Sequence, residues 1–314
     1  MKISKAFLQK TYQTEEELQQ IIQHLFRNKE LSETSKRQYS IKIPQWISYL
    51  SAPKTLQNLI ENPENSIKCL QTTDKIKHSA SNHHIYISSV VAFIKYILKN
   101  KSPLLKEWKE YEKHNWKPIA EHYEENKPTE LQSNKIMTFD EIDTIRKSLE
   151  KGSVERLLIS FYTLIEPIRA DYYATEILTT ATQESTEENY IILTPHISKL
   201  IVKDFKTKQK YEKIENTLSD ELRNELEESL KRNPRNYLFT TPDDQMKPFT
   251  RKLFSNWACR TLTRVLKQPM TLTVLRHIYI TKKIQDKTSP KELINIAKNM
   301  GHSRDIQRVY EWNV

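Results

Sequence analysis

The sequence predicts a mainly α-helical protein that carries a small antiparallel β-sheet. Apolar residues recur at helical spacing through most of the chain, whereas short apolar runs typical of strands are confined to residues 190–214. With 314 residues, the chain is long enough for two domains, each with its own core. We expect an N-terminal helical extension at 1–30, a helical domain at 31–124, a linker at 125–136 and a mixed α+β domain at 137–314.

The composition narrows the partners and the compartment. The formal net charge is +10, with an excess of Lys and Arg in both halves of the chain, which suits a protein that encloses a polyanion but also fits an unrelated basic protein. The only cysteines, Cys69 and Cys259, are spaced unlike a zinc motif or a disulfide framework, which favours a reducing compartment. We find no secretory leader and no apolar run of the roughly 18 residues that a membrane span needs. We therefore expect the cytoplasm or the nucleus, without membrane contact.

One helix is expected within residues 1–30. Thr14 and Glu17 have the spacing of a capping box. The apolar residues that follow fall on one helical face: Leu18, Ile21, Ile22 and Leu25. We expect this face to pack on its own chain; contact with another protomer or with a second DNA site is the alternative.

Helical spacing continues through the first domain. Residues 35–50 and 83–98 each place large apolar side chains on one face. A further helix is expected to begin at Pro103, because proline suits the first helical position. Pro44 is expected to kink or interrupt its helix, and Pro118 is expected to break the helix that contains it.

In the second domain, Arg169 closely follows an apolar helix expected at 157–164. An arginine at the end of a buried helix is costly unless it pairs with a carboxylate or binds an anion. From the residues alone, an ion pair with Asp171 or Glu176 and an anion site are equally good interpretations.

The sheet is expected from three runs, at 190–193, 200–205 and 211–214, with the turn FKTKQKY between the second and the third. Further helices are expected after a capping box formed by Thr138 and Glu141, at 219–231 and at 251–266.

The most informative stretch is 271–310. A helix is expected at 274–285, and a second begins at Ser289 with the N-cap, proline and glutamate signals of a helix start. It ends at Gly301, one of only two glycines in the chain. This glycine indicates a turn with a positive φ angle that presents His302.

Three side chains in this stretch can act together on a phosphodiester. The guanidinium of Arg276 offers a planar fork of donors that matches phosphate oxygens. His302 can donate to the same group, and the hydroxyl of Tyr310 can attack phosphorus and hold the product covalently. Taken singly, each is a modest signal, because histidines often follow helices and tyrosines often pack in cores.

The segments LRHIYIT and MGHS, with a tyrosine eight residues after the histidine, resemble the C-terminal half of the tyrosine recombinases of the phage-integrase type. The pattern Pro-x-Arg-x-Asp-Tyr around Arg169 looks most like members carried by large DNA viruses and their satellite elements. The resemblance covers roughly 31–310, and LSETSKRQYSIKIPQWISYL is similar to the opening of the family's core-binding domain.

The resemblance implies a helical core-binding domain that clamps DNA and a catalytic domain that cuts it. In the family, two arginines and a histidine surround the scissile phosphate, a tyrosine attacks it, and a lysine on a β-hairpin protonates the leaving 5′ oxygen. The matching residues are Arg169, Arg276, His302, Tyr310 and Lys206. Lys208 and Lys210 are alternatives for the lysine, and Asp171 would be a structural partner beside Arg169. The implied product is a 3′-phosphotyrosine linkage, formed without a metal, a cofactor or ATP.

One position departs from the family pattern. Thr273 stands three residues before Arg276, where the family usually has histidine or lysine. A hydroxyl can donate to a phosphate oxygen, but it carries no charge and does not shuttle a proton at neutral pH. His277 would project away from the Arg276 face, so we expect it to pack rather than to replace the missing group.

The expected function is site-specific DNA integration or recombination, in which a homotetramer exchanges strands between two double-stranded attachment sites through a Holliday junction. A type IB topoisomerase-like enzyme and a catalytically degenerate DNA-binding module are the alternatives. The enzyme would act inside the host cell, or travel in a virion. Further contacts to DNA are expected from Lys36, Arg37, Lys208, Arg251 and Lys252.

Overall fold

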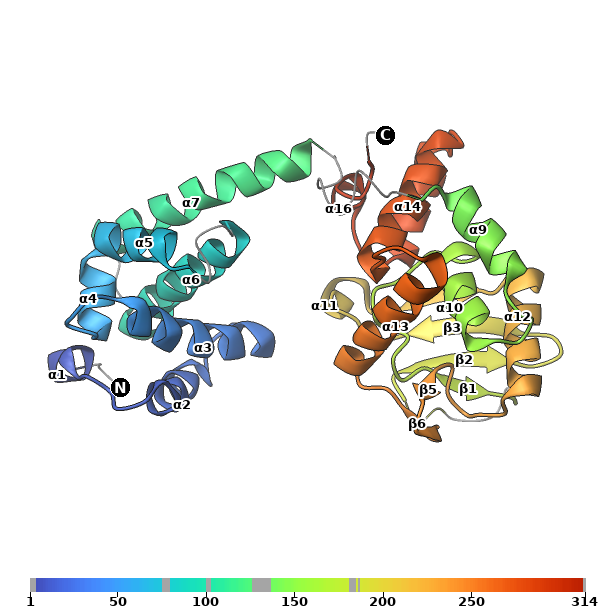
Figure 1. Ribbon diagram of the computed structural model, residues 1–314, viewed down its shortest axis with the longest axis horizontal. Coiled ribbons are helices and arrows are strands. Elements are labelled where there is room, and N and C mark those ends of the chain that lie inside the picture. Colours follow the sequence, from blue (N-terminus) through green and yellow to red (C-terminus); the bar gives the residue numbers. More distant parts are fainter. Residues whose placement is uncertain are drawn as a thin grey trace. The chain divides into compact units, whose positions relative to one another are not determined.

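The computed structural model describes residues 4–74, 80–99, 103–125, 137–180, 185 and 187–312 (Figure 1). The chain divides into two compact units, Met1–Glu124 and Glu125–Val314, which are described separately below. From residue 126 onward, the expected linker at 125–136 lies outside the described residues.

The first unit is entirely helical in its described part. Its elements are α1 (Lys5–Gln9), α2 (Glu15–Phe26), α3 (Glu33–Tyr49), α4 (Leu56–Glu61), α5 (Pro63–Thr72), α6 (Ala80–Ala92), a π-helix (Phe93–Leu98) and α7 (Pro103–Glu124). The helices α2, α3, α6 and α7 enclose the core, in which the rings of Trp46 and Trp108 meet edge to face with centroids 5.5 Å apart. Both indole N–H groups are satisfied by backbone carbonyls, those of Ser66 and Ile60.

Three expectations for this unit are revised. The apolar face of α2 packs on its own chain as expected, but Glu17 does not complete the capping box, because its carboxylate accepts from the Gln13 amide and from Lys10. The helices α3 and α7 continue through Pro44 and Pro118 instead of breaking. For α3, burial of the apolar residues on both sides of Pro44 outweighs the missing backbone hydrogen bond.

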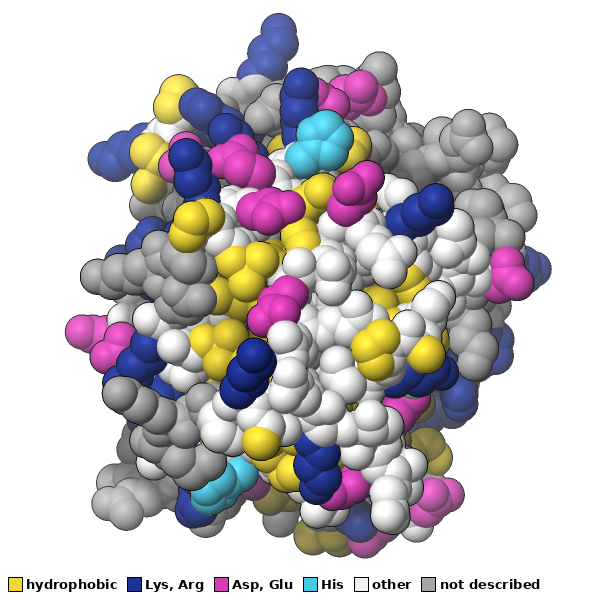
Figure 2. Space-filling model, turned by 90° about the vertical axis from the view of Figure 1, so that its left-hand side faces the viewer, with side chains coloured by type: hydrophobic (Ala, Val, Ile, Leu, Met, Phe, Trp, Pro, Cys, Tyr) yellow, Lys and Arg dark blue, Asp and Glu magenta, His cyan; other side chains and the backbone are white. Residues whose placement is uncertain are grey.

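The surface of this unit shows no large basic patch on the face seen in Figure 2. Among the residues coloured there by type, Lys and Arg alternate with Asp and Glu across a largely uncharged surface. The positive net charge of the chain is therefore not concentrated on that face.

The second unit is mixed α+β. Its elements are α9 (Phe139–Ser148), α10 (Val154–Thr163), β1 (Glu176–Leu178), β2 (Asn189–Leu193), β3 (Ser198–Val202), α11 (Lys208–Tyr211), β4 (Ile214–Thr217), α12 (Asp220–Arg232), β5 (Thr240–Thr241), β6 (Asp244–Pro248), α13 (Arg251–Leu266), α14 (Leu272–Gln285), α15 (Pro290–Asn299) and α16 (Arg304–Arg308). The mainly helical class with a small sheet is confirmed. The capping boxes of Thr138 and Ser289 are present as predicted.

The main sheet has the order β1-β2-β3-β4. The pairs β2–β3 and β3–β4 are antiparallel as expected, and β1 adds a parallel strand beside β2 that was not predicted. The sequence did not reveal β1 because a strand of three residues is too short to show alternation. The third expected strand, 211–214, was also misplaced: α11 ends at Tyr211 and β4 begins at Ile214.

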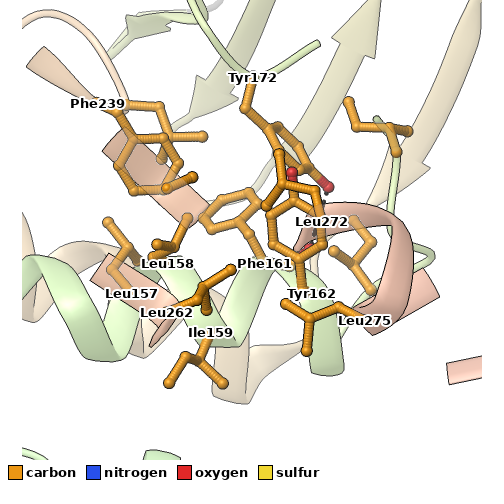
Figure 3. Packing of buried hydrophobic residues seen from close by; sticks show 14 of the residues in the cluster. Leu157, Leu158, Ile159, Phe161, Tyr162, Tyr172, Phe239, Leu262, Leu272 and Leu275 are labelled. Atoms are coloured by element: carbon orange, nitrogen blue, oxygen red, sulfur yellow. Dashed lines mark hydrogen bonds between the residues drawn. The ribbon is translucent and has the colours of Figure 1, made fainter. Parts of the chain in front are cut away.

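An aromatic group at the centre of this unit fixes the chain beside Arg169. The rings of Phe161 and Tyr162, on α10, meet that of Tyr172 edge to face, and Figure 3 shows Leu275 of α14 beside them. The Tyr162 hydroxyl donates to the carbonyl oxygen of Arg169 over 2.8 Å. The core therefore sets the position of the backbone that carries this arginine.

A buried ion network joins α9, α10 and α12. The Arg146 guanidinium, which is 0% exposed, donates to Glu225 over 3.3 Å, and Arg156 donates to both oxygens of the same carboxylate over 2.7 and 2.5 Å. Arg146 also donates to Asp143 and Glu221. One carboxylate thus compensates two largely buried guanidinium groups.

Neutralising that carboxylate is expected to destabilise the second unit. Glu225→Gln removes the carboxylate that pairs with Arg156 and one of the three carboxylates that pair with Arg146, so the free energy of unfolding should fall by about 3 kcal/mol. Glu228→Gln is the matched control on the same helix, because Glu228 pairs only with Lys231 at the surface and should change stability by less than about 0.5 kcal/mol. Urea unfolding measures both, and equal stabilities for the two variants would contradict this account of the network.

Candidate active site

The side chain of Arg276 is the centre of the site. It lies on α14, is 1% exposed, and forms hydrogen bonds with three separate segments. Nε donates to the Pro167 carbonyl oxygen over 3.1 Å, and Nη1 donates to the Tyr310 hydroxyl over 3.0 Å. Nη2 lies 2.9 Å from Nδ1 of His302. Burial lowers the pKa of Arg276 to about 10, so the guanidinium keeps its charge at neutral pH.

Arg169 reaches the same phenol oxygen. Its Nη2 lies 3.5 Å from the Tyr310 hydroxyl. The expected structural partner, Asp171, forms its ion pair with Arg251 instead. In the described part of the chain no carboxylate forms an ion pair with Arg169. The Arg169 guanidinium therefore contacts the Tyr310 hydroxyl and is not held in a direct ion pair within the described residues, which favours the anion-site interpretation over the ion-pair one.

Gly301 presents His302 by the expected turn. Its φ angle is +70°, and a Cβ there would lie 3.0 Å from Ile214 and 3.2 Å from Phe205. Both the conformation and the close packing require glycine. The turn also lets the His302 amide donate to the Ala297 carbonyl over 3.0 Å, so the imidazole is held where α15 ends.

The protonation state of His302 follows from its neighbours. A guanidinium only donates, so Nδ1 must accept from Arg276 and the neutral ring carries its proton on Nε2. Burial, followed by the charges of Arg276 and Arg169, lowers the pKa of His302 to about 3. Nε2 is buried and has no hydrogen-bond partner among the described residues. It is therefore an N–H donor that lacks an acceptor beside two guanidinium groups.

Both the ring and the backbone of Tyr310 are held by contacts within the same chain. Its ring stacks on His302 with centroids 5.4 Å apart, and the Arg276 guanidinium lies 4.6 Å from the ring centroid. The backbone carbonyl of Tyr310 accepts from Nδ1 of His277 over 3.1 Å. The next anchor is Trp312, whose ring stacks on His277 at 4.5 Å and whose amide donates to Thr281 over 3.0 Å. The packing role expected for His277 thus includes positioning of the tyrosine.

Lys206 is distinguished from its two rivals by its surroundings. All three lysines lie between β3 and β4 and are exposed. Lys208 forms an ion pair with Asp204 at 3.0 Å, and Lys210 lies over the ring of Tyr211. Within the described residues, the Lys206 ammonium makes no ion pair, hydrogen bond or ring contact. Of the three, Lys206 is the one whose ammonium is not engaged.

The remaining residues singled out from the sequence fall into three groups. Thr273, Arg37 and Lys252 are exposed, and Thr273 lies one turn before Arg276 on α14. Lys36 is buried, because its ammonium donates to the Arg27 carbonyl and to Glu33 inside the first unit, which speaks against a contact with DNA. Arg251 forms an ion pair with Asp171, and Lys208 forms one with Asp204.

Sequence reasoning missed the supports of this site. Trp312 gave no signal, because an isolated aromatic residue after Tyr310 fits no periodic pattern, and the role of Tyr162 depends on a tertiary contact with Arg169. Among the described residues, no group of three or more His, Cys, Asp or Glu side chains is arranged to hold a metal ion. None of the helices in the described ranges has the length and apolar character needed to cross a membrane.

Comparisons with known proteins show a likeness of fold to solved structures. No protein-family model matches the chain, and no curated protein matches its sequence. Among solved structures, the chain is similar to the crystal structure of an XerA recombinase, with 14% identity over 95% of this chain and 93% of that chain and a TM-score of 0.41. An overlap at this level carries no argument about activity, so the functional proposal below depends on the geometry of the site.

The two buried histidines are expected to make the protein acid-sensitive. Burial lowers the pKa of His277 to about 4 and that of His302 to about 3, whereas an unfolded histidine titrates near 6.5. The unfolded chain therefore binds more protons as the pH falls below about 6.5. Stability from the two neutral rings is fully present above that pH and is lost toward pH 4, by up to about 1.4 kcal/mol per pH unit for each histidine.

Unfolding experiments between pH 7 and 5 measure this dependence. The double variant His277→Gln, His302→Gln should show a shallower dependence of unfolding free energy on pH than the unaltered protein. His196→Gln, which changes an exposed histidine, should leave the slope unchanged. The prediction fails if the double variant retains the full slope.

Proposed function

We propose that this protein breaks and rejoins DNA strands through a transient covalent bond between Tyr310 and a DNA 3′ phosphate, as a tyrosine recombinase does. The observation that carries the proposal is that two guanidinium groups meet at one phenol oxygen, with the His302 ring held against one of them. The two guanidinium groups, from distant parts of the chain, donate to the phenol oxygen, and the buried Nε2–H of His302, which lacks an acceptor, lies beside them. Such an array fits the non-bridging oxygens of a phosphodiester.

The chemistry follows from the residue types. The Tyr310 oxygen attacks phosphorus, the phenol proton leaves to solvent, and the new P–O bond forms as the bond to the 5′ oxygen breaks. Arg169, Arg276 and His302 stabilise the charge that develops on the non-bridging oxygens. The departing 5′ oxygen takes a proton from Lys206. Because the phosphodiester energy is kept in the phosphotyrosine bond, attack by a 5′ hydroxyl restores a DNA strand without ATP.

The unliganded site is already close to this arrangement. The guanidinium groups that donate to the Tyr310 hydroxyl are the groups proposed to hold the phosphate, so the nucleophile and the anion site are adjacent. His277 and Trp312 hold the tyrosine backbone in the same chain. We infer that each protomer supplies its own nucleophile.

The finer proposal is site-specific integration. The protein would act as a homotetramer on two double-stranded attachment sites and exchange strands through a Holliday junction, with the first unit as a clamp on the DNA. The net charge of +10 and the small helical unit that precedes the site support this reading. Arg37 and Lys252, which are exposed, are the proposed phosphate contacts outside the site.

Trapping of a covalent adduct tests the chemistry. A pool of nicked DNA duplexes with randomised sequence around the nick is incubated with the protein, and DNA that stays bound under denaturing conditions is sequenced. Cleavage near the nick releases a short fragment that cannot religate, so the adduct should accumulate. Tyr310→Phe should give no adduct, because it lacks the attacking oxygen.

Tyr279→Phe is the matched control, since Tyr279 packs in the same apolar cluster as Tyr310 and should form the adduct normally. An adduct on the recovered sequence without any four-way junction product would favour a topoisomerase-like enzyme. Retention of DNA without an adduct would instead show a binding module and contradict the proposed reaction.

A further inference from the structure

We propose that Asn189 is a positioning residue for the general acid of this reaction, because it ties the turn that carries Lys206 to the loop that carries Arg169. The inference rests on the proposed function, and it adds to the residues that support the reaction one that lies outside the group around Tyr310. Asn189 begins β2 and is 3% exposed. We call residues 203–207 the Lys206 turn and residues 167–171 the Arg169 loop.

The amide of Asn189 makes four hydrogen bonds. Its Oδ1 accepts from the backbone amides of Lys203 and Asp204 over 2.9 and 2.8 Å. Its Nδ2 donates to the carbonyl oxygens of Asp171 and Asp204 over 2.9 and 3.2 Å. An asparagine amide has two acceptor sites and two donor hydrogens, so its full capacity is used.

These partners also fix which way the amide points. The two backbone N–H groups can only donate and the two carbonyl oxygens can only accept. Rotating the amide by half a turn would replace all four hydrogen bonds with clashes of like polarity. The side chain is therefore a specific connector between the two segments, which are separated by more than thirty residues in the sequence.

The far end of the Lys206 turn is anchored to the histidine. The Thr207 hydroxyl donates to the Gly301 carbonyl over 2.6 Å, and the buried ring of Phe205 packs against Gly301. The backbone of Lys206 is thus held between Asn189 on one side and the residue before His302 on the other. Its long side chain stays exposed, as a proton donor that must reach a DNA oxygen requires.

Loss of Asn189 should affect the Lys206 turn more than the Arg169 loop. Three of its four hydrogen bonds go to residues 203 and 204. The Arg169 loop has independent supports, since Tyr162 donates to the Arg169 carbonyl and Arg251 pairs with Asp171. The structure therefore assigns the main effect of Asn189 to the lysine.

Changing the leaving group in the DNA distinguishes a role of Asn189 in positioning the general acid from any other role of Asn189 in the reaction. When the P–O5′ bond breaks, its electron pair goes to the 5′ oxygen, which needs the Lys206 proton to become a hydroxyl. A duplex with sulfur in place of the scissile 5′ oxygen releases a thiolate, which is a far weaker base and leaves without protonation. Variants that only misplace the acid should therefore regain activity on the sulfur duplex.

The experiment uses the duplex recovered from the trapping pool, synthesised with either 5′ oxygen or 5′ sulfur at the scissile phosphate, and measures single-turnover adduct formation by the full chain. On oxygen, Lys206→Ala should be slower by about 100-fold and Asn189→Ala by about tenfold or more, and both should return to within about threefold of the unaltered protein on sulfur. Asn216→Ala is the control: Asn216 is buried in β4, its amide has no hydrogen-bond partner among the described residues, and its removal should affect neither duplex.

The outcomes are distinguishable. If Asn189→Ala is slowed equally on both duplexes, or not slowed on oxygen, the inference is wrong while the proposed function stands. If the trapping pool yields no adduct with the unaltered protein, the proposed function fails and the inference fails with it. Thermal unfolding of Asn189→Ala checks that the variant is folded, and Asn189→Asp provides a second test, because it keeps both acceptors but turns a carboxylate toward two carbonyl oxygens and should show the same rescue by sulfur.

Discussion

The second unit depends on one buried cation. Arg276 has almost no exposed surface, so its charge must be solvated by protein groups instead of water. It satisfies this requirement with the Pro167 carbonyl, the His302 ring and the Tyr310 hydroxyl, each from a different segment. Because these groups compensate one charge, three segments meet at Arg276: the first residue of the Arg169 loop, the turn after α15 and the segment after α16. The same contacts leave an N–H donor on His302 and a second guanidinium, from Arg169, beside the phenol.

The supports around this centre divide into two sides. On one side, His277 and Trp312 dock the backbone of Tyr310 on α14. On the other, Asn189 and Thr207 connect the Lys206 turn to the Arg169 loop and to Gly301. The contacts of Asn189 and Thr207 are made largely to backbone atoms. They therefore fix the backbone positions from which the reactive side chains extend, and not the contacts of those side chains. A reaction that requires several groups within hydrogen-bond reach of one phosphate depends on such placement.

Helix starts and the turn at Gly301 were the parts that the sequence predicted best. Ser289, Thr138 and Gly301 act through local rules of capping and backbone conformation, so their roles are visible in a short window of sequence. The proximity of Arg169 to Arg276 could not be derived from such rules, and it was expected only through the resemblance to a family. The structure places both arginines within hydrogen-bond distance of the Tyr310 hydroxyl.

Other features were out of reach because they depend on tertiary contacts. Pro44 was expected to disturb its helix, but the core on both sides of it prevails. The strand β1 is too short to show periodicity. The Asp171 carboxylate pairs with Arg251, although Arg169 is nearer to it in the sequence. Asn189 gave no signal because its four partners lie in two segments that only the folded sheet brings together.

The central claim is that Arg169, Arg276 and His302 form one anion site around the Tyr310 hydroxyl. The most direct measurement is a crystal structure of Tyr310→Phe bound to the DNA duplex selected by the unaltered protein. Our account predicts that the non-bridging oxygens of a single phosphate lie within hydrogen-bond distance of both guanidinium groups and of Nε2 of His302. A complex in which the phosphate binds elsewhere, and these three groups contact only protein, would contradict it.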